Sequence, residues 1–341
     1  MTLRTAALLL ALACRSDPVP QPVTDVVIIR DALDATTGIL GYRAVGRDVP
    51  EHLWDALFST QGYQRLKDRE LAMQRPFTDS AFRAFLLSDT LLARLPELLP
   101  AVRLWSEINL GSAAAKAAAY LPAGTPIRAN LYPLIKPRGN SFVHRGPDGV
   151  MGIFIYVDPT MPPSELRTTL AHELHHIGYA AACPDTTDPT FTPVEQSLRR
   201  MLGAFAEGLA MLAAAGGPDV DPNAMSRKSM RDTWARNMSQ VAGHFAAIDS
   251  LIQDVATGRV TSPDSVMAKA VTFYGDQGPW YTVGWVMGST IERASGRDRL
   301  ITILCRPAAL IREYQGIVEK RQDASPRWSR NSLKWLEDRK S

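Results

Sequence analysis

Five consecutive residues of the 341-residue chain, from His172 to His176, read HELHH and match the pattern H-E-x-x-H. On an α-helix, side chains four residues apart lie one above the other, ~6 Å apart along the axis. The imidazoles of His172 and His176 can therefore both reach one Zn²⁺ at about 2.0–2.1 Å. Glu173 projects about 100° away from His172, so it is better placed to take a proton from a zinc-activated water than to bind the metal. The pattern predicts one zinc per chain, with Glu173 as the general base.

The residues around the motif predict a helix over 164–183. Its apolar positions fall within one stripe of about 80°, which we expect to face the core. These positions are Leu166, Leu170, Leu174, Ile177 and Ala181. His172 and His176 fall on a different face, so they are not spare members of the apolar stripe. His175 points away from both, and we expect it at the surface or behind the metal ligands.

A catalytic zinc needs a third protein ligand and one open position. A third histidine six residues after His176 is one known solution, but Ala182 stands there. Glu207 is the better candidate, because it interrupts the apolar run AFAEGLA, where an acid without a partner is costly to bury. Glu195 is the rival. It begins the same predicted helix, where the helix dipole already accounts for a carboxylate.

With HELHH followed by AEGLA about thirty residues later, the chain resembles the gluzincin zinc metallopeptidases. It is most similar to uncharacterised bacterial zinc-dependent peptidases of the MA-like group. The resemblance covers roughly residues 126–305 and includes two later segments, 281–284 (Y-x-x-G) and 296–300 (G-x-D-x-L). It implies a zincin-like catalytic core, Glu207 as the third zinc ligand, and peptides or proteins as substrates. One departure is Met211, which stands where thermolysin-type enzymes have an aspartate.

A peptidase of this kind also needs a donor for the oxyanion that develops on the substrate carbonyl. Tyr281 is the first candidate, Tyr274 the second and His244 the third, since a phenol or an imidazole can serve. An ordinary half-buried tyrosine remains an equally open interpretation of Tyr281. The apolar strand predicted at 149–157 is either a sheet edge that pairs with an extended substrate or a plain core strand.

The N-terminus has the layout of a secretory signal peptide over residues 1–13, with a basic start, an apolar middle and a small residue before the cut. The apolar run is too short to span a bilayer, which takes about 20 residues. The sequence ALAC ending at Cys14 resembles a bacterial lipobox and implies a lipid anchor on Cys14. Residues 14–24 then form a Pro-rich tether. We expect a protein of the bacterial cell envelope, lipid-anchored on the periplasmic side or the outer surface. A secreted soluble protein is the alternative.

Two further cysteines, Cys183 and Cys305, lie far apart in the sequence. An exported protein could join them in a disulfide. Two buried free thiols are the other interpretation, and the sequence does not decide between them.

The pattern of elements predicts a predominantly helical α+β fold. Residues 25–125 are expected to form a helical N-terminal region, with single helices over 80–95 and 97–120. Residues 126–305 form the catalytic region, whose strands over 127–135 and 149–157, with 139–146 a third strand or a turn, precede the motif helix. One helix is expected over 193–215. Residues 306–341 form a basic helical tail.

Composition and charge exclude other classes of protein. The chain is 45% hydrophobic, which excludes a disordered protein, and its net charge of +3 gives no basic field for nucleic acid. Two other functions stay open: a catalytically inactive envelope lipoprotein with a binding or structural role, and a zinc hydrolase of another substrate class. The intact Glu173 disfavours the inactive protein, since a pure binder does not need it. The sequence predicts no oligomeric state.

Overall fold

The computed structural model describes residues 24–139, 141–184, 188–321 and 324–338. The predicted signal peptide, Cys14 and nearly all of the tether lie outside these residues. Among the described helices, none combines the length and the apolar character that crossing a membrane would take.

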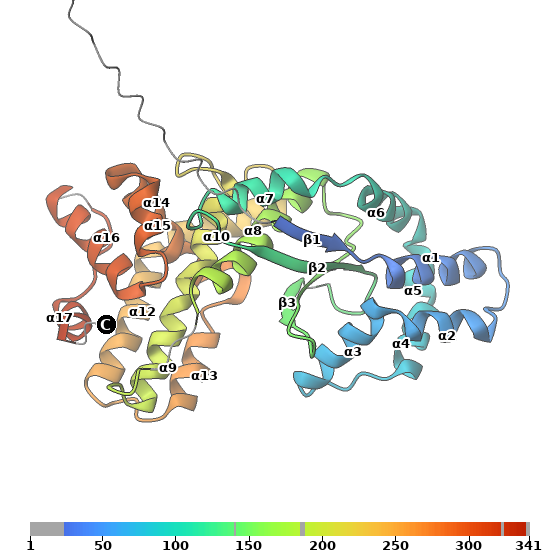
Figure 1. The fold of residues 1–341 in the computed structure, drawn as a ribbon, viewed down its shortest axis with the longest axis horizontal. Coiled ribbons are helices and arrows are strands. Elements are labelled where there is room, and N and C mark those ends of the chain that lie inside the picture. The colour runs from blue at the N-terminus through green and yellow to red at the C-terminus, as the bar shows by residue number, and fades with distance from the viewer. Residues whose placement is uncertain (1–23, 140, 185–187, 322–323, 339–341) are drawn as a thin grey trace, which may run out of the picture.

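The fold is α+β and mostly helical, as predicted, with one small sheet. In Figure 1 the N-terminal helices lie at one end, the C-terminal helices at the other, and the sheet with α7, α8 and α10 between them. One hydrophobic cluster extends through the whole molecule, from Ala32 in the first helix to Leu336 in the last.

The sheet has the strand order β1-β2-β4-β3. The strands are β1 (Thr24–Ile28), β2 (Ile127–Leu134), β3 (Phe142–Arg145) and β4 (Met151–Tyr156). β1 and β2 are parallel, β2 and β4 are parallel, and β3 pairs antiparallel with β4. β4, within the predicted strand 149–157, is therefore paired on both sides. The interpretation of this strand as a free edge for substrate is wrong, because the segment 139–146, expected as a third strand or a turn, contains the edge strand β3.

Seven helices separate β1 from β2 in the sequence. They are α1 (Asp31–Ala44), α2 (Glu51–Ser59), α3 (Gln61–Ala72), α4 (Asp79–Leu86), α5 (Asp89–Ala93), α6 (Leu95–Glu107) and α7 (Leu110–Ala118). The predicted single helices over 80–95 and 97–120 are each two helices. Ser88 and Asn109 cause the breaks, since their side chains accept hydrogen bonds from the backbone N–H groups of Leu91 and Gly111 and so begin new helices.

The motif helix is α8 (Pro163–Ala182), which begins after the extended Pro162. It packs against β2, α7 and α10. Leu166, Leu170, Leu174 and Ile177 are buried as predicted. Ala181 is exposed instead, because it lies in the last turn, next to the bend of the chain at Cys183.

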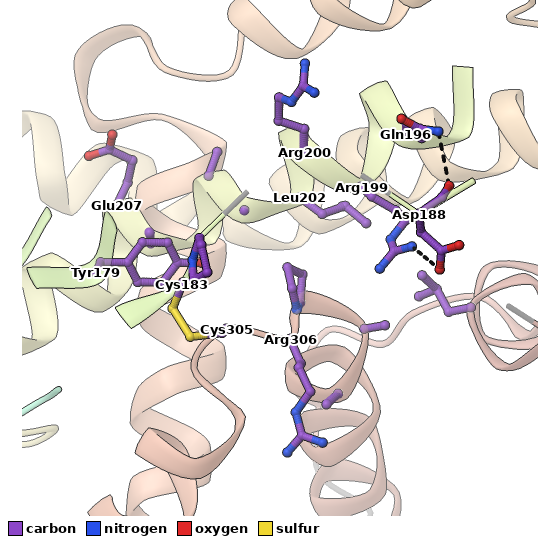
Figure 2. A pocket seen from close by; sticks show the side chains of 18 of the residues that line it. Tyr179, Cys183, Asp188, Gln196, Arg199, Arg200, Leu202, Glu207, Cys305 and Arg306 are labelled. Atoms are coloured by element: carbon purple, nitrogen blue, oxygen red, sulfur yellow. Dashed lines mark hydrogen bonds and ion pairs between the residues drawn. A yellow bond between two sulfur atoms is a disulfide. The ribbon is translucent and has the colours of Figure 1, made fainter. Parts of the chain in front are cut away.

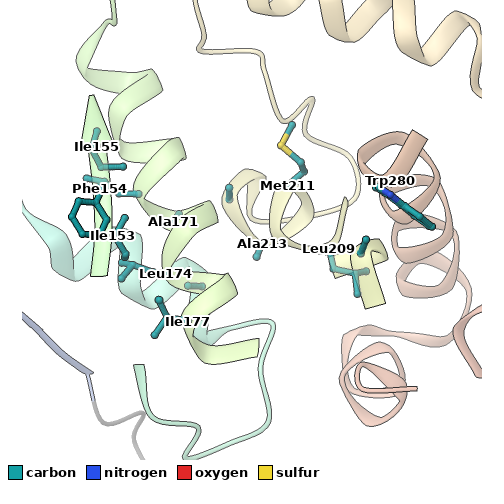
Figure 3. Packing of buried hydrophobic residues seen from close by; sticks show 14 of the residues in the cluster. Ile153, Phe154, Ile155, Ala171, Leu174, Ile177, Leu209, Met211, Ala213 and Trp280 are labelled. Atoms are coloured by element: carbon teal, nitrogen blue, oxygen red, sulfur yellow. The ribbon is translucent and has the colours of Figure 1, made fainter. Parts of the chain in front are cut away.

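The second half of the molecule is a cluster of helices. They are α9 (Pro193–Leu202), η1 (Gly203–Phe205), α10 (Ala206–Ala215), α11 (Lys228–Ser239), α12 (Val241–Ala256), α13 (Pro263–Val271), η2 (Gly275–Gln277), α14 (Pro279–Ser295), α15 (Arg297–Ile303), α16 (Pro307–Arg321) and α17 (Arg330–Asp338). The predicted helix over 193–215 is thus interrupted by the 3₁₀ turn η1, which separates α9 from α10. Figure 3 shows apolar side chains of β4 and α8 on one side of the core, and those of α10 with Trp280 of α14 on the other.

Helices α10 and α14 approach each other at two glycines. A Cβ atom placed on Gly208 would come closer than 3.0 Å to backbone atoms of Tyr281, Gly284 and Trp285. A Cβ on Gly284 would likewise meet the carbonyl oxygen of Phe205. Because only hydrogen fits at these positions, the two backbones can lie in contact, which fixes Glu207 of α10 beside Tyr281 of α14.

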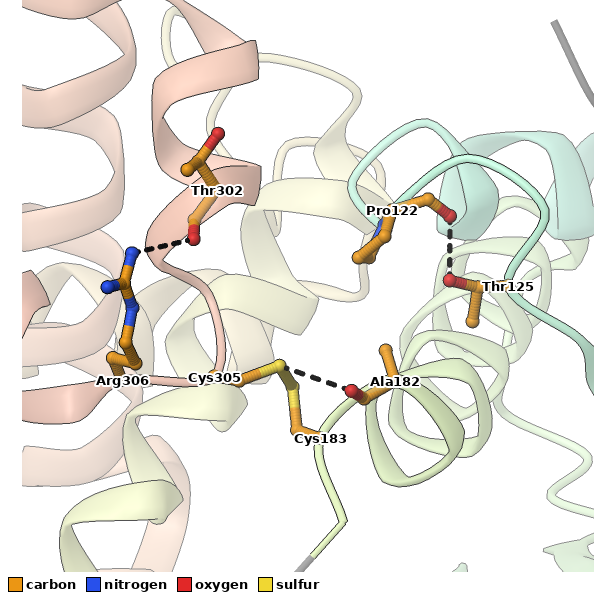
Figure 4. The surroundings of a disulfide bond; sticks show 7 residues. All are labelled: Pro122, Thr125, Ala182, Cys183, Thr302, Cys305 and Arg306. Atoms are coloured by element: carbon orange, nitrogen blue, oxygen red, sulfur yellow. Dashed lines mark hydrogen bonds between the residues drawn. A yellow bond between two sulfur atoms is a disulfide. The ribbon is translucent and has the colours of Figure 1, made fainter. Parts of the chain in front are cut away.

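Cys183 and Cys305 are joined in a disulfide. Cys183 directly follows the end of α8, and Cys305 lies between α15 and α16 (Figure 4). Of the two interpretations left open by the sequence, the structure has the disulfide. It fixes the start of α16 to the C-terminal end of the motif helix.

The glycine contact predicts a large effect of one methyl group. Gly208→Ala would force α10 and α14 apart and lower the free energy of unfolding by roughly 1–3 kcal/mol or more. The measurement is urea unfolding followed by circular dichroism. Gly203→Ala is the matched control, because Gly203 has an ordinary φ and nothing within 4 Å of the added Cβ. Equal stability of the two variants would contradict the importance of the close approach.

Candidate active site

Three predicted metal ligands meet where α8 contacts α10. Nε2 of His172 lies 3.0 Å from Nε2 of His176. Oε2 of Glu207 lies 3.2 Å from the first nitrogen and 3.1 Å from the second. Among the described residues, these three side chains form the one His/Cys/Asp/Glu group whose donor atoms are close enough to share a metal ion. His176 and Glu207 are 31 residues apart in the sequence, and the packing of α8 against α10 brings their side chains together.

The three donors fit a zinc ion in chemistry and spacing. Two imidazole nitrogens and one carboxylate oxygen are a usual ligand set for catalytic zinc. Ligands at about 2.0–2.1 Å from a tetrahedral zinc are about 3.3 Å apart, close to the observed distances. Two Nε2 atoms and a carboxylate oxygen at these distances direct their lone pairs toward one point. The site therefore favours a positive charge at its centre, which is what a cation supplies.

The pKa shifts of the ligand group agree with a site that binds a cation. Burial acts against protonation of His176, but the charge of Glu207 and its hydrogen bond outweigh burial and raise the His176 pKa to about 9. Burial acts to raise the pKa of Glu207, but both histidines outweigh it and hold that pKa below its usual range. Glu207 is thus ionised, as a ligand must be.

Glu173, the predicted general base, lies next to this group on α8. Burial raises its pKa, and the nearby Glu207 carboxylate adds to the effect, while the charges of His172 and His176 oppose it. A carboxylate with a raised pKa accepts a proton more readily than an ordinary surface glutamate. Its environment therefore suits proton transfer better than permanent ion pairing.

Tyr281 reaches the site from α14. Its ring is nearly parallel to that of His172, with an interplanar angle of 10° and ring centroids 6.1 Å apart. Burial raises the pKa of the phenol well above its usual range, and the Glu207 carboxylate raises it further. The phenol therefore stays protonated and able to donate a hydrogen bond.

The other candidates for the oxyanion donor and for the third metal ligand have different surroundings. Tyr274 lines the same cavity as His176 and Glu207, and burial raises its pKa to about 12. Nδ1 of His244 lies 2.8 Å from Oγ1 of Thr282, so this nitrogen already has a hydrogen-bond partner. Glu195 accepts hydrogen bonds from the backbone N–H and hydroxyl of Thr192 in a capping box at the start of α9. The dipole explanation of Glu195 therefore accounts for its position, and the structure does not bring it to the ligand group.

Three further residues bear on the description of the site. His175 is fully buried, so of its two expected places the surface is excluded, and burial lowers its pKa to about 3. Nδ1 of His172 is buried and has no hydrogen-bond partner among the described residues. Met211, one turn after Glu207, is buried and offers no acceptor in the place of the missing aspartate.

A cavity of about 470 Å³ opens beside the ligand group. His176, Glu207 and Tyr274 lie at the metal end of it, and its walls come from α9, the start of α16, and α17. Figure 2 shows Glu207 on one side of the disulfide and Arg306 on the other. The sequence did not predict these walls, because α9 and α16 are over a hundred residues apart.

Fold and site thus define an α+β protein with a candidate metal centre between two helices, open to a cavity. A family model described as "Putative zinc dependent peptidase (DUF5700)" matches residues 54–323. Because the match covers more than half of the chain, the chain belongs to this family. No curated protein and no solved structure matches the chain.

The family match confirms the coarse prediction that the chain belongs to a zinc-dependent peptidase family. Such a family consists of hydrolases that act on peptides. The match begins in α2 and ends after α16. It therefore extends well before residue 126, where the resemblance seen in the sequence begins, and includes most of the N-terminal helices.

Proposed function

We propose that this protein is a gluzincin-type zinc metallopeptidase that binds one zinc through His172, His176 and Glu207. The observation that carries the proposal is the convergence of these three donor atoms within 3.0–3.2 Å, next to Glu173 and inside a match to a zinc peptidase family. The packing of α8 between the sheet and α10 supports a zincin-like core.

Zinc, when bound there, supplies a Lewis acid and makes water acidic enough to be deprotonated near neutral pH. The chain's own groups then handle the protons. Glu173 takes the proton from the attacking water as it adds to the peptide carbonyl, and delivers that proton to the leaving amine nitrogen. The raised pKa of Glu173 suits both halves of this transfer.

Tyr281 donates a hydrogen bond to the carbonyl oxygen as negative charge develops on it. Two features support this role: the phenol is held protonated, and its ring lies alongside the His172 ring at the ligand group. A fixed donor of this kind stabilises the transition state more than the bound substrate.

The location in the cell envelope, through a lipid anchor on Cys14, belongs to the same proposal. The disulfide between Cys183 and Cys305 supports export, since disulfides persist in oxidising compartments outside the cytosol. An active zinc peptidase at that location needs Glu173, whereas an inactive binding protein does not. The intact Glu173 therefore favours the peptidase.

The metal assignment is tested by zinc content. The full-length chain should hold about one zinc, measured by mass spectrometry, and Glu207→Gln should weaken zinc binding by at least about 100-fold. Glu195→Gln is the matched control, since Glu195 is the other acid proposed for this role and lies in a helix cap. Unchanged zinc in Glu207→Gln would remove Glu207 from the ligand set.

The general base is tested with Glu173→Gln. This variant should keep its zinc and lose about 10²–10⁴ in kcat on a peptide library, because the amide cannot accept the proton. Glu97→Gln, at an exposed position in α6, controls for the substitution itself. Activity within a factor of ten of the unmodified chain would reject Glu173 as the base.

The oxyanion donor is tested by comparing two tyrosines. Tyr281→Phe should lower kcat by about 10²–10³ with little change in KM or zinc content, since the lost hydrogen bond forms in the transition state. Tyr274→Phe should have a smaller effect. The reverse order would transfer the role to Tyr274.

A further inference from the structure

The cavity beside the ligand group is rich in arginine. Arg199 and Arg200 of α9, Arg306 just before α16, and Arg312 within α16 all line it. Of the acids that the structure describes, two line it. Asp188 lies 3.6 Å from Arg199, and Glu207 belongs to the ligand group.

Arg306 and Arg312 are paired with no acid among the residues that the structure describes. Nη2 of Arg306 donates to the carbonyl oxygen of Thr302 at 3.1 Å, and Nη1 of Arg312 donates to that of Leu336 at 3.2 Å. Neither guanidinium forms an ion pair with any residue that the structure describes. A carbonyl uses one donor of a guanidinium and leaves its charge and remaining donors available.

The surroundings strengthen the field of these two arginines. The first turn of α16, from Pro307 to Ala309, lines the same cavity and adds the positive end of the helix dipole. The walls also include Trp335 and Leu336, and a concave site with apolar walls concentrates the field of its charges.

We propose that this cavity binds a carboxylate of the peptide substrate, with Arg306 and Arg312 determining that specificity. The inference rests on the proposed peptidase function and names its substrate class: peptides with a carboxylate close to the cleaved bond. A guanidinium matches a carboxylate with two parallel hydrogen bonds, and the apolar walls can contact the rest of the residue. The carboxylate is either an aspartate or glutamate side chain or the C-terminal group of the peptide.

The disulfide gives this recognition a fixed geometry. Arg306 directly follows Cys305, which is bonded to Cys183 at the end of α8 (Figures 2 and 4). The helix that carries His176 is therefore linked covalently to the residue next to Arg306. A carboxylate bound by Arg306 is thereby held at a set distance from the ligand group.

The test compares Arg306→Glu and Arg306→Gln with Arg236→Glu in the zinc-loaded full-length chain. Arg306 is exposed, and among the described residues its guanidinium bonds to the carbonyl of Thr302, so we expect its replacement to spare the fold. Arg236 is an exposed arginine of α11 outside the cavity, and its replacement changes the net charge equally. The probes are peptides blocked at both ends that carry glutamate, glutamine or lysine at one varied position. A fourth probe is the glutamine peptide with a free C-terminal carboxylate.

The unmodified chain and Arg236→Glu should cleave the glutamate peptide, or the free-carboxylate peptide, with kcat/KM roughly tenfold or more above the lysine peptide. Arg306→Gln should reduce this preference, and Arg306→Glu should abolish or reverse it. Preference for the glutamate peptide identifies a side-chain carboxylate, and preference for the free end identifies the C-terminal group. Absence of any preference, or the same loss in Arg236→Glu, would overturn the inference.

A binding measurement separates this inference from the peptidase function itself. Fluorescence anisotropy of the same four peptides, labelled with a dye, is measured on Glu173→Gln, with and without Arg306→Glu. Preferential binding of a carboxylate peptide that depends on Arg306, with no cleavage by the unmodified chain, would reject the peptidase and keep the carboxylate site. Cleavage without that preference in either measurement would reject the carboxylate site and keep the peptidase.

Discussion

The site depends on the packing of α10 against α8 on one side and α14 on the other. Two ligand histidines are provided by one helix, and their geometry follows from helical spacing alone. The third donor comes from α10, and the phenol comes from α14. Gly208 allows α10 and α14 to touch through their backbones, so the position of Glu207 is fixed by the residue that follows it. The local sequence around Glu207 therefore supplies both the ligand and the means of placing it.

This packing leaves ionisable groups at a partly buried helix contact. A carboxylate between two imidazoles is stable there because the three groups compensate one another, which the opposite pKa shifts of His176 and Glu207 express. A cation at their centre extends the same compensation and removes the need for an extra proton. Glu173 is not one of the three compensating groups. Its raised pKa leaves the carboxylate able to take up a proton.

The sequence predicted what is local and missed what is distant. H-E-x-x-H defines its own geometry, and the apolar run around Glu207 singles out that acid, so the sequence alone names the three residues whose donor atoms the structure brings together. The breaks at Ser88 and Asn109 were missed, because a capping side chain competes with helix propensity and leaves no strong pattern. The sequence left two places open for His175, because the helix packing that buries this residue, which includes the contact of α7 with α8, depends on distant parts of the chain. The choice between a disulfide and two thiols for Cys183 and Cys305 depended on the same kind of distant contact.

In the functions proposed above, catalysis and substrate selection come from different parts of the chain. The candidate ligand group and Glu173 lie on α8 and α10, well inside the family match, and the hydrolytic centre proposed for them does not define a substrate. The walls that would recognise a carboxylate come from α9, α16 and α17, and Trp335 and Leu336 lie beyond the matched residues. The disulfide couples the two parts, because it joins the end of α8 to the start of α16. Substrate choice can therefore change through α16 and α17 while the catalytic helices stay as they are.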